Sequence, residues 1–129
     1  MNEKIDAIIN KIVHSIYSIK GIKKGQILFY ALYEEDSMAS GLFYRASIKE
    51  KIIYFDADDT IVDNCFELNS IMSKENMQWN LFILKIENMK FNVEFKYPKK
   101  IGETLNETTL REELLEGYFG VSTVVYPPL

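Results

Sequence analysis

The sequence predicts an α+β domain in which an antiparallel sheet of about five strands carries helices packed mainly on one side. Apolar residues recur at helical spacing near the N-terminus and again after residue 58. The segments around 26–45 and 79–97 instead consist of strand-like runs separated by short polar turns. Short connections between consecutive strands favour antiparallel pairing. At 129 residues the chain fits one domain, residues 1–129.

The first half of the chain predicts one helix and three strands. Residues 3–19 place isoleucines and one valine three or four positions apart, which is typical of an amphipathic helix. Residues 26–33 form a β-rich run, and an acidic loop followed by small residues leads to a second strand at 42–45. This pair is expected to be a hairpin with a loose acidic tip. Residues 52–55 are expected to form a short third strand.

The second half predicts a helix, a further hairpin and a late helix. Apolar residues from 61 to 72 have helical spacing, and Asp58, Asp59 or Thr60 is placed to cap that helix. Residues 79–87 and 90–97 are expected to form two strands joined at Asn88-Met89. The second of these alternates strictly between apolar and polar residues, which predicts one buried and one solvated face. A short helix over 107–117 and an extended tail complete the chain.

Composition and charge exclude several classes of function. The formal net charge of −4 argues against nucleic-acid binding, which relies on clustered Lys and Arg. The charged N-terminus leads into no apolar signal region, and no apolar run is long enough to span a bilayer. The single cysteine, Cys65, cannot form an internal disulfide, in agreement with a reducing compartment. We therefore expect a cytoplasmic protein without membrane contact.

One motif carries a possible chemistry. Residues 52–60 join four apolar residues to Asp56-Ala57-Asp58-Asp59-Thr60, which resembles the first motif of haloacid-dehalogenase-type phosphatases. That resemblance would make Asp56 a nucleophile and Asp58 an acid/base, both helping to hold Mg²⁺. The family needs a parallel, doubly wound sheet, whereas the motif here follows a hairpin and precedes only about 70 residues. A strand end followed by a helix cap is the simpler interpretation.

Other candidate catalytic residues are isolated. His14 is the sole histidine and lies on the first helix, with no second His or Cys to complete a zinc site. Cys65 lies on the apolar side of the middle helix, where a buried structural thiol is far commoner than a nucleophile. We expect no enzyme activity, no metal and no cofactor.

Acidic and aromatic residues suggest instead a surface that binds a basic protein. One acidic cluster is expected at the tip of the first hairpin and a second around the start of the middle helix. Tyrosines on strand faces suit either a core or a partner interface. The candidate partner-binding residues are Glu34, Glu35, Asp36, Tyr44, Tyr54, Asp56, Asp58, Asp59 and Asp63.

The last hairpin carries a family resemblance. The stretch Trp79-Asn80-Leu81-Phe82-Ile83-Leu84, followed by Lys90-Phe91-Asn92-Val93-Glu94-Phe95-Lys96-Tyr97, resembles the YezG-like antitoxin and immunity proteins. In that family a Trp opens a strand, and the returning strand has the form K-F-x-h-x-F-x-Y, where h is apolar. The layout of helix, hairpin, middle helix and Trp hairpin is also similar, as are Arg111 and Tyr118-Phe119-Gly120 near the end.

The resemblance implies a cytoplasmic protein that binds and neutralises a cognate toxin domain, often a nuclease, without a cofactor or catalytic residue. The charge argument agrees, because an acidic protein can occlude a basic nuclease surface and associate with it rapidly. Two alternatives stay open. One is a small Mg²⁺-dependent phosphatase using Asp56 and Asp58, and the other is a ligand-binding or adaptor domain with the same fold. The oligomeric state is not fixed by the sequence.

Overall fold

The computed structural model confirms the α+β class and describes residues 3–34, 37–97, 107–121 and 123–126. Three helices accompany one six-stranded sheet in the order β5-β4-β1-β2-β3-β6. All described strand pairs are antiparallel except β3 with β6. No helix in these ranges is long and apolar enough to cross a membrane. The elements are α1 (Glu3–Tyr17), β1 (Gln26–Glu34), β2 (Ser37–Arg45), β3 (Ile52–Phe55), α2 (Asp59–Lys74), β4 (Leu81–Glu87), β5 (Lys90–Lys96), α3 (Glu107–Phe119) and β6 (Val124–Val125).

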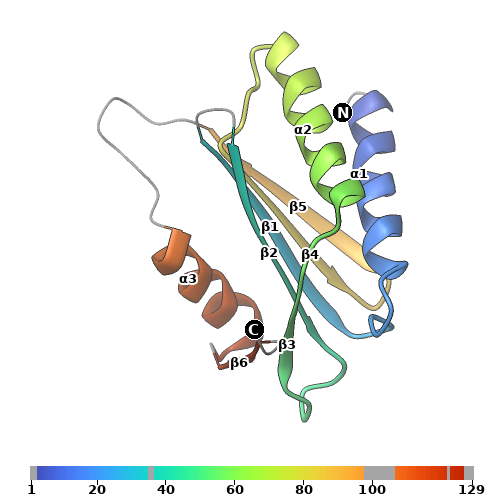
Figure 1. Cartoon of the computed structure of the whole chain (residues 1–129), viewed down its shortest axis with the longest axis vertical. Coiled ribbons are helices and arrows are strands. Elements are labelled where there is room, and N and C mark those ends of the chain that lie inside the picture. Colours follow the sequence, from blue (N-terminus) through green and yellow to red (C-terminus); the bar gives the residue numbers. More distant parts are fainter. Residues whose placement is uncertain (1–2, 35–36, 98–106, 122, 127–129) are drawn as a thin grey trace.

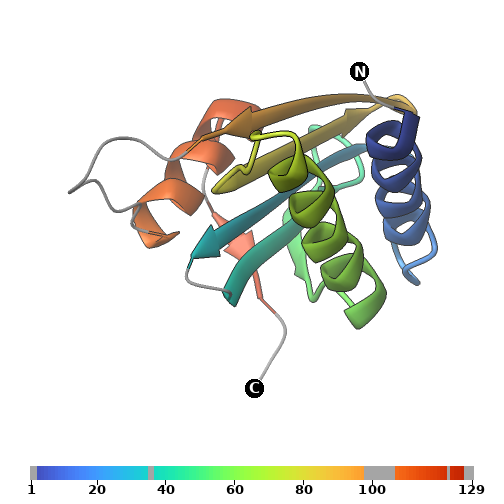
Figure 2. The ribbon, with the colours of Figure 1, turned by 90° about the horizontal axis from the view of Figure 1, so that it is seen from above.

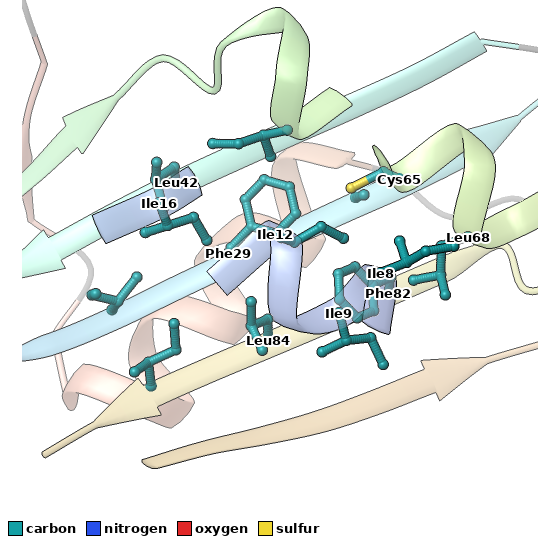
Figure 3. Close-up of a cluster of buried hydrophobic side chains, with 14 of the residues drawn as sticks. Ile8, Ile9, Ile12, Ile16, Phe29, Leu42, Cys65, Leu68, Phe82 and Leu84 are labelled. Carbon is teal, nitrogen blue, oxygen red and sulfur yellow. The ribbon is translucent and has the colours of Figure 1, made fainter. Parts of the chain in front are cut away.

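Helices α1 and α2 lie side by side on one face of the sheet, as expected for helices gathered mainly on one side (Figures 1 and 2). The isoleucines of α1 and the apolar residues of α2 pack onto inward-facing residues of β1, β2 and β4 (Figure 3). Cys65 belongs to this layer and is fully buried, which confirms the structural interpretation of the thiol. Close packing of β-branched and aliphatic side chains is therefore the main stabilising feature of this face.

Helix α3 covers the opposite face, where its buried residues Leu110, Leu115 and Phe119 contact a second apolar cluster (Figure 2). Strand β1 is consequently covered on both sides, and residues 27–32 are all buried. This explains why β1 is a continuous apolar run rather than an alternating one. The helix expected over 107–117 extends to Phe119 and ends at Gly120, whose φ of +82° suits a glycine.

The first hairpin is longer and tighter than the sequence suggested. Strand β2 begins at Ser37, so the small residues 39–41 belong to the strand and not to a loose loop. Gly41 is paired with Tyr30, and a Cβ atom at Gly41 would come within 2.4 Å of the Tyr30 ring. Glycine is thus required there because the aromatic ring of the neighbouring strand covers its Cα.

The second hairpin confirms the expected pairing but not the expected burial. Asn88 and Met89 form its turn with φ values of 53° and 65°, the left-handed conformation required in a two-residue turn. Strand β5 lies at the edge of the sheet, and the apolar face expected to be buried is only partly covered. Phe91 is 41% exposed, while Val93 and Phe95 are half-buried. The predicted alternation of apolar and polar residues is confirmed. Because β5 is an edge strand, however, its apolar face is only partly buried.

Candidate protein-binding surface

One segment of the chain is strongly negative and lacks basic residues. Residues 52–73 contain four aspartates, one glutamate and no Lys or Arg, so the segment carries −5 while the whole chain carries −4. The rest of the chain sums to +1, although residues 103–116 form a second acidic segment with five glutamates and one arginine. All five carboxylates are exposed. We call this surface the acidic ridge; its members are Asp56, Asp58, Asp59, Asp63 and Glu67.

Local structure explains how the ridge is built. Asp58 caps α2, with its Oδ1 accepting a hydrogen bond from the Ile61 backbone N–H at 3.0 Å. Asp59 occupies the first turn, where the helix dipole favours an anion. Asp63 and Glu67 follow Asp59 at intervals of four residues and so lie on the same side of α2. Each of these residues is displaced by about 6 Å along the helix axis from the one before it. Glu67 was not among the predicted residues, although its spacing from Asp63 could have identified it.

The ridge is not explained by stability alone. Like charges four residues apart destabilise a helix by about 0.2–0.5 kcal/mol per pair. Within the described part of the chain, none of Asp59, Asp63 and Glu67 forms an ion pair that would offset this repulsion. The capping role accounts for Asp58 and the dipole for Asp59, but neither effect extends to Asp63 and Glu67.

The other predicted acidic cluster is separate from the ridge. Glu34 ends β1, is exposed, and pairs with Ser37 at the start of β2. Asp56 follows Phe55, whose partner on β2 is Leu42. Ser37 and Leu42 are five positions apart on β2. Glu34 and the start of the ridge are therefore about 17 Å apart along the strand direction. Glu35 and Asp36 lie outside the described residues.

The two predicted tyrosines lie on opposite faces of the sheet. Tyr44 is packed under α1 and α2 with only 5% of its surface exposed, and its hydroxyl donates to the Lys24 carbonyl at 2.9 Å. Tyr44 is therefore a core residue and is left out of the surface proposed below. Tyr54 is half-buried on the α3 face beside Asp56. Burial, followed by the nearby Asp56 carboxylate, raises the pKa of Tyr54.

Next to Tyr54 lies an arginine site that the sequence did not reveal. The Arg111 guanidinium lies over the rings of Tyr30, Phe43 and Tyr54, with its Cζ at 5.8, 5.4 and 5.6 Å from the three centroids. Its Nε donates to the Tyr30 hydroxyl at 2.8 Å, and its Nη2 contacts Glu107 Oε1 at 3.4 Å. Burial alone would lower the pKa of Arg111, but hydrogen bonds to Tyr30 and Tyr126 and the charge of Glu107 raise it overall. The guanidinium is thus a fixed cation that fastens α3 to the sheet.

The structure does not reproduce the environment of the phosphatase motif. Strand β3 pairs antiparallel with β2, and the sheet is mostly antiparallel rather than doubly wound and parallel. The Asp58 carboxylate is engaged as a helix cap. Among the described residues, no group of three His, Cys, Asp or Glu side chains is placed to hold a metal ion. His14 is exposed on α1.

The space between the helices and the sheet is filled by the core side chains (Figure 3). A surface hollow of about 660 Å³ lies between α1 and α2, and its rim carries Lys4, Lys11, Glu67 and Lys74. Such an open, mixed-charge groove differs from the apolar pocket expected of a small-ligand site. No protein-family model and no curated protein sequence matches the chain.

Proposed function

We propose that this protein is a cytoplasmic immunity protein that binds a basic toxin domain, a nuclease, through the acidic ridge and thereby blocks it. The observation that carries the proposal is the concentration of charge: the ridge segment holds −5 in a chain of net charge −4, and all five carboxylates face solvent. The resemblance of the Trp79 hairpin to YezG-like immunity proteins supports the same class of function.

The chemistry of a nuclease makes it a suitable target for such a surface. A nuclease must hold phosphates, and it does so with clustered Lys and Arg. Carboxylates that occupy those cations compete directly with the nucleic acid. The opposite potentials also accelerate association, and this acceleration declines as salt screens the charges. Tyr54 adjoins Asp56 but packs on the α3 face against Phe43, Tyr126 and Arg111, so the proposed contact depends on the carboxylates of the ridge.

The test needs the cognate toxin domain, to be sought among the products of the neighbouring genes, and two variants of equal charge change. Asp59→Lys/Asp63→Lys reverses the centre of the ridge. Glu112→Lys/Glu113→Lys makes the same change on the exposed side of α3 and serves as the control. We expect the ridge variant to raise the Kd for the toxin about 100-fold or more and to lose protection of growing cells, while the control stays near wild type.

Each outcome has a distinct meaning. A wild-type Kd that rises with salt, together with selective loss in the ridge variant, supports the proposal. Equal losses in both variants would mean that total charge, and not the ridge, governs binding. Failure of the wild-type protein to bind a folded, active toxin domain would remove the proposed function. Thermal melting of both variants separates loss of contact from loss of fold.

A further inference from the structure

Strand β5 leaves one edge of the sheet open. It is the terminal strand of the sheet, and within the described residues β4 is its sole strand partner (Figure 2). The two-residue turn makes Glu87 and Lys90 a hydrogen-bonded pair, and such pairs alternate along an antiparallel ladder. The backbone N–H and C=O groups of Phe91, Val93 and Phe95 therefore point away from β4. These are the groups to which another strand would bind.

Both faces of β5 are hollowed around the same two residues. On the α1 side a hollow of about 510 Å³ is lined by Asp6, Ile9, Asn10, Phe91, Asn92 and Val93. On the α3 side a hollow of about 390 Å³ is lined by Lys85, Glu87, Lys90, Phe91, Asn92, Glu94 and Tyr118. Phe91 and Asn92 border both. The edge thus offers free backbone groups, an exposed aromatic ring and space on each side of Asn92.

We propose that β5 binds β5 of a second copy of this chain, antiparallel and two-fold symmetric about Asn92. In this register Phe91 pairs with Val93 of the second copy, and both residues present outward-facing backbone groups. Lys90 lies opposite Glu94 of the second copy, and the symmetry creates this pair twice. Cross-strand pairs of opposite charge stabilise a sheet, and the pairing covers the exposed Phe91 ring.

Charge selects this register among those that the backbone allows. A pairing centred on Val93 would place Lys90 opposite Lys96 of the second copy, and one centred on Glu94 would place two glutamates opposite each other; both are repulsive. A pairing centred on Phe95 would match Glu94 with Lys96 but would overlap only three residues of β5. The register centred on Asn92 overlaps five residues and brings the hollows of the two copies together.

This interface is independent of the proposed toxin contact. Three strands separate β5 from β3, after which the ridge begins. A dimer formed through β5 would join the two sheets and keep both α1/α2 layers on the same side, because a two-fold axis perpendicular to the sheet preserves its faces. Each copy would retain its own acidic ridge.

The experiment measures the monomer–dimer equilibrium of the full chain by sedimentation over a concentration series. We expect a reversible dimer, and we expect Lys90→Glu or Glu94→Lys alone to raise its Kd about tenfold or more. The double variant Lys90→Glu/Glu94→Lys restores opposite charges at both pairs and should return the Kd to near the wild-type value. Thermal melting of each single variant checks that it folds, so that a raised Kd reports the lost charge pair.

Lys96→Glu is the matched control because residue 96 faces the neutral Asn88 of the second copy in the proposed register. Its Kd should stay near wild type. A tighter dimer would instead indicate the Val93-centred register, and a weaker one the Phe95-centred register; either result overturns the proposal. A wild-type protein that remains monomeric up to about 1 mM also overturns it. None of these outcomes depends on whether a toxin binds the ridge.

Discussion

The two faces of the sheet are stabilised in different ways. On the α1/α2 face, α1 alone contributes five buried isoleucines, and they pack against aliphatic and aromatic side chains. On the α3 face, the helix contributes three buried apolar residues, and its partly buried Arg111 lies against three aromatic rings. One face depends on apolar area and shape, whereas the other adds directional contacts of a cation. The first should therefore resist local opening and the second should depend on a single residue.

The largest effect is expected on the α1/α2 face. Ile12 is fully buried between α1 and the sheet, and Ile12→Ala should lower the free energy of unfolding by about 2–5 kcal/mol through lost burial and the remaining cavity. Chemical denaturation measures the loss. Lys11→Ala, an exposed neighbour on the same helix, should change stability little. Because alanine favours the helix at both positions, a similar loss in both variants would show that burial of Ile12 is not what stabilises the α1 layer.

A smaller and more local effect is expected on the α3 face. Arg111→Met keeps the unbranched apolar part of the side chain but removes the guanidinium, and with it the hydrogen bond to Tyr30 and the contacts with the rings, which together are worth about 1–3 kcal/mol. Amide hydrogen exchange should accelerate in α3 while α1 stays protected. Arg111→Lys retains the charge without the planar group and should give an intermediate result. Uniform acceleration in all helices would contradict the independence of the two faces.

The contrast between the faces also explains what could be predicted from sequence. The isoleucine spacing of α1 and the alternation of β5 are local patterns, and both predicted the correct element. The contact between Arg111 and Tyr30 joins residues 81 positions apart and has no local pattern. Similarly, β6 pairs with β3 through a long-range parallel contact, so the local sequence pattern predicts only an extended tail there. The side of the sheet that α3 covers depends on the same kind of contact.

The candidate surface also has features that local sequence patterns predict and features that depend on long-range contacts. Asp58, Asp59 and Asp63 were predicted from their place around a helix start, and the structure exposes all three. Tyr44 and Tyr54 both lie on strands, but strand propensity does not say which face a helix will cover. The structure buries Tyr44 on the α1/α2 face and leaves Tyr54 half-buried on the α3 face, next to Asp56. The exposed edge of β5 was also hidden, because the order of strands in a sheet follows from tertiary contacts.

The smallest expected effect is a difference in alkaline stability between the two faces. Burial raises the pKa of Cys65, on the α1/α2 face, to about 12 from 9.0. Burial also raises the pKa of Tyr30, on the α3 face, to about 12 from 10.0, although Arg111 opposes the shift. A raised pKa means that the unfolded chain loses its proton first. Stability from each group is therefore complete below its unfolded pKa and declines as pH rises toward 12.

The two groups can be separated because their declines begin at different pH values. Cys65→Ala should flatten the loss of stability that starts near pH 9, and Tyr30→Phe should flatten only the part above pH 10. Denaturant midpoints measured between pH 8 and about 11 give the dependence of stability on pH for each variant. Tyr97 is exposed, so Tyr97→Phe serves as the control. Tyr30→Phe also removes the hydroxyl that accepts from Arg111, so its midpoint should already be lower at pH 8. If Cys65→Ala left the slope between pH 9 and 10 unchanged, the thiol would have to reach solvent, and the α1/α2 layer would open more readily than its packing indicates.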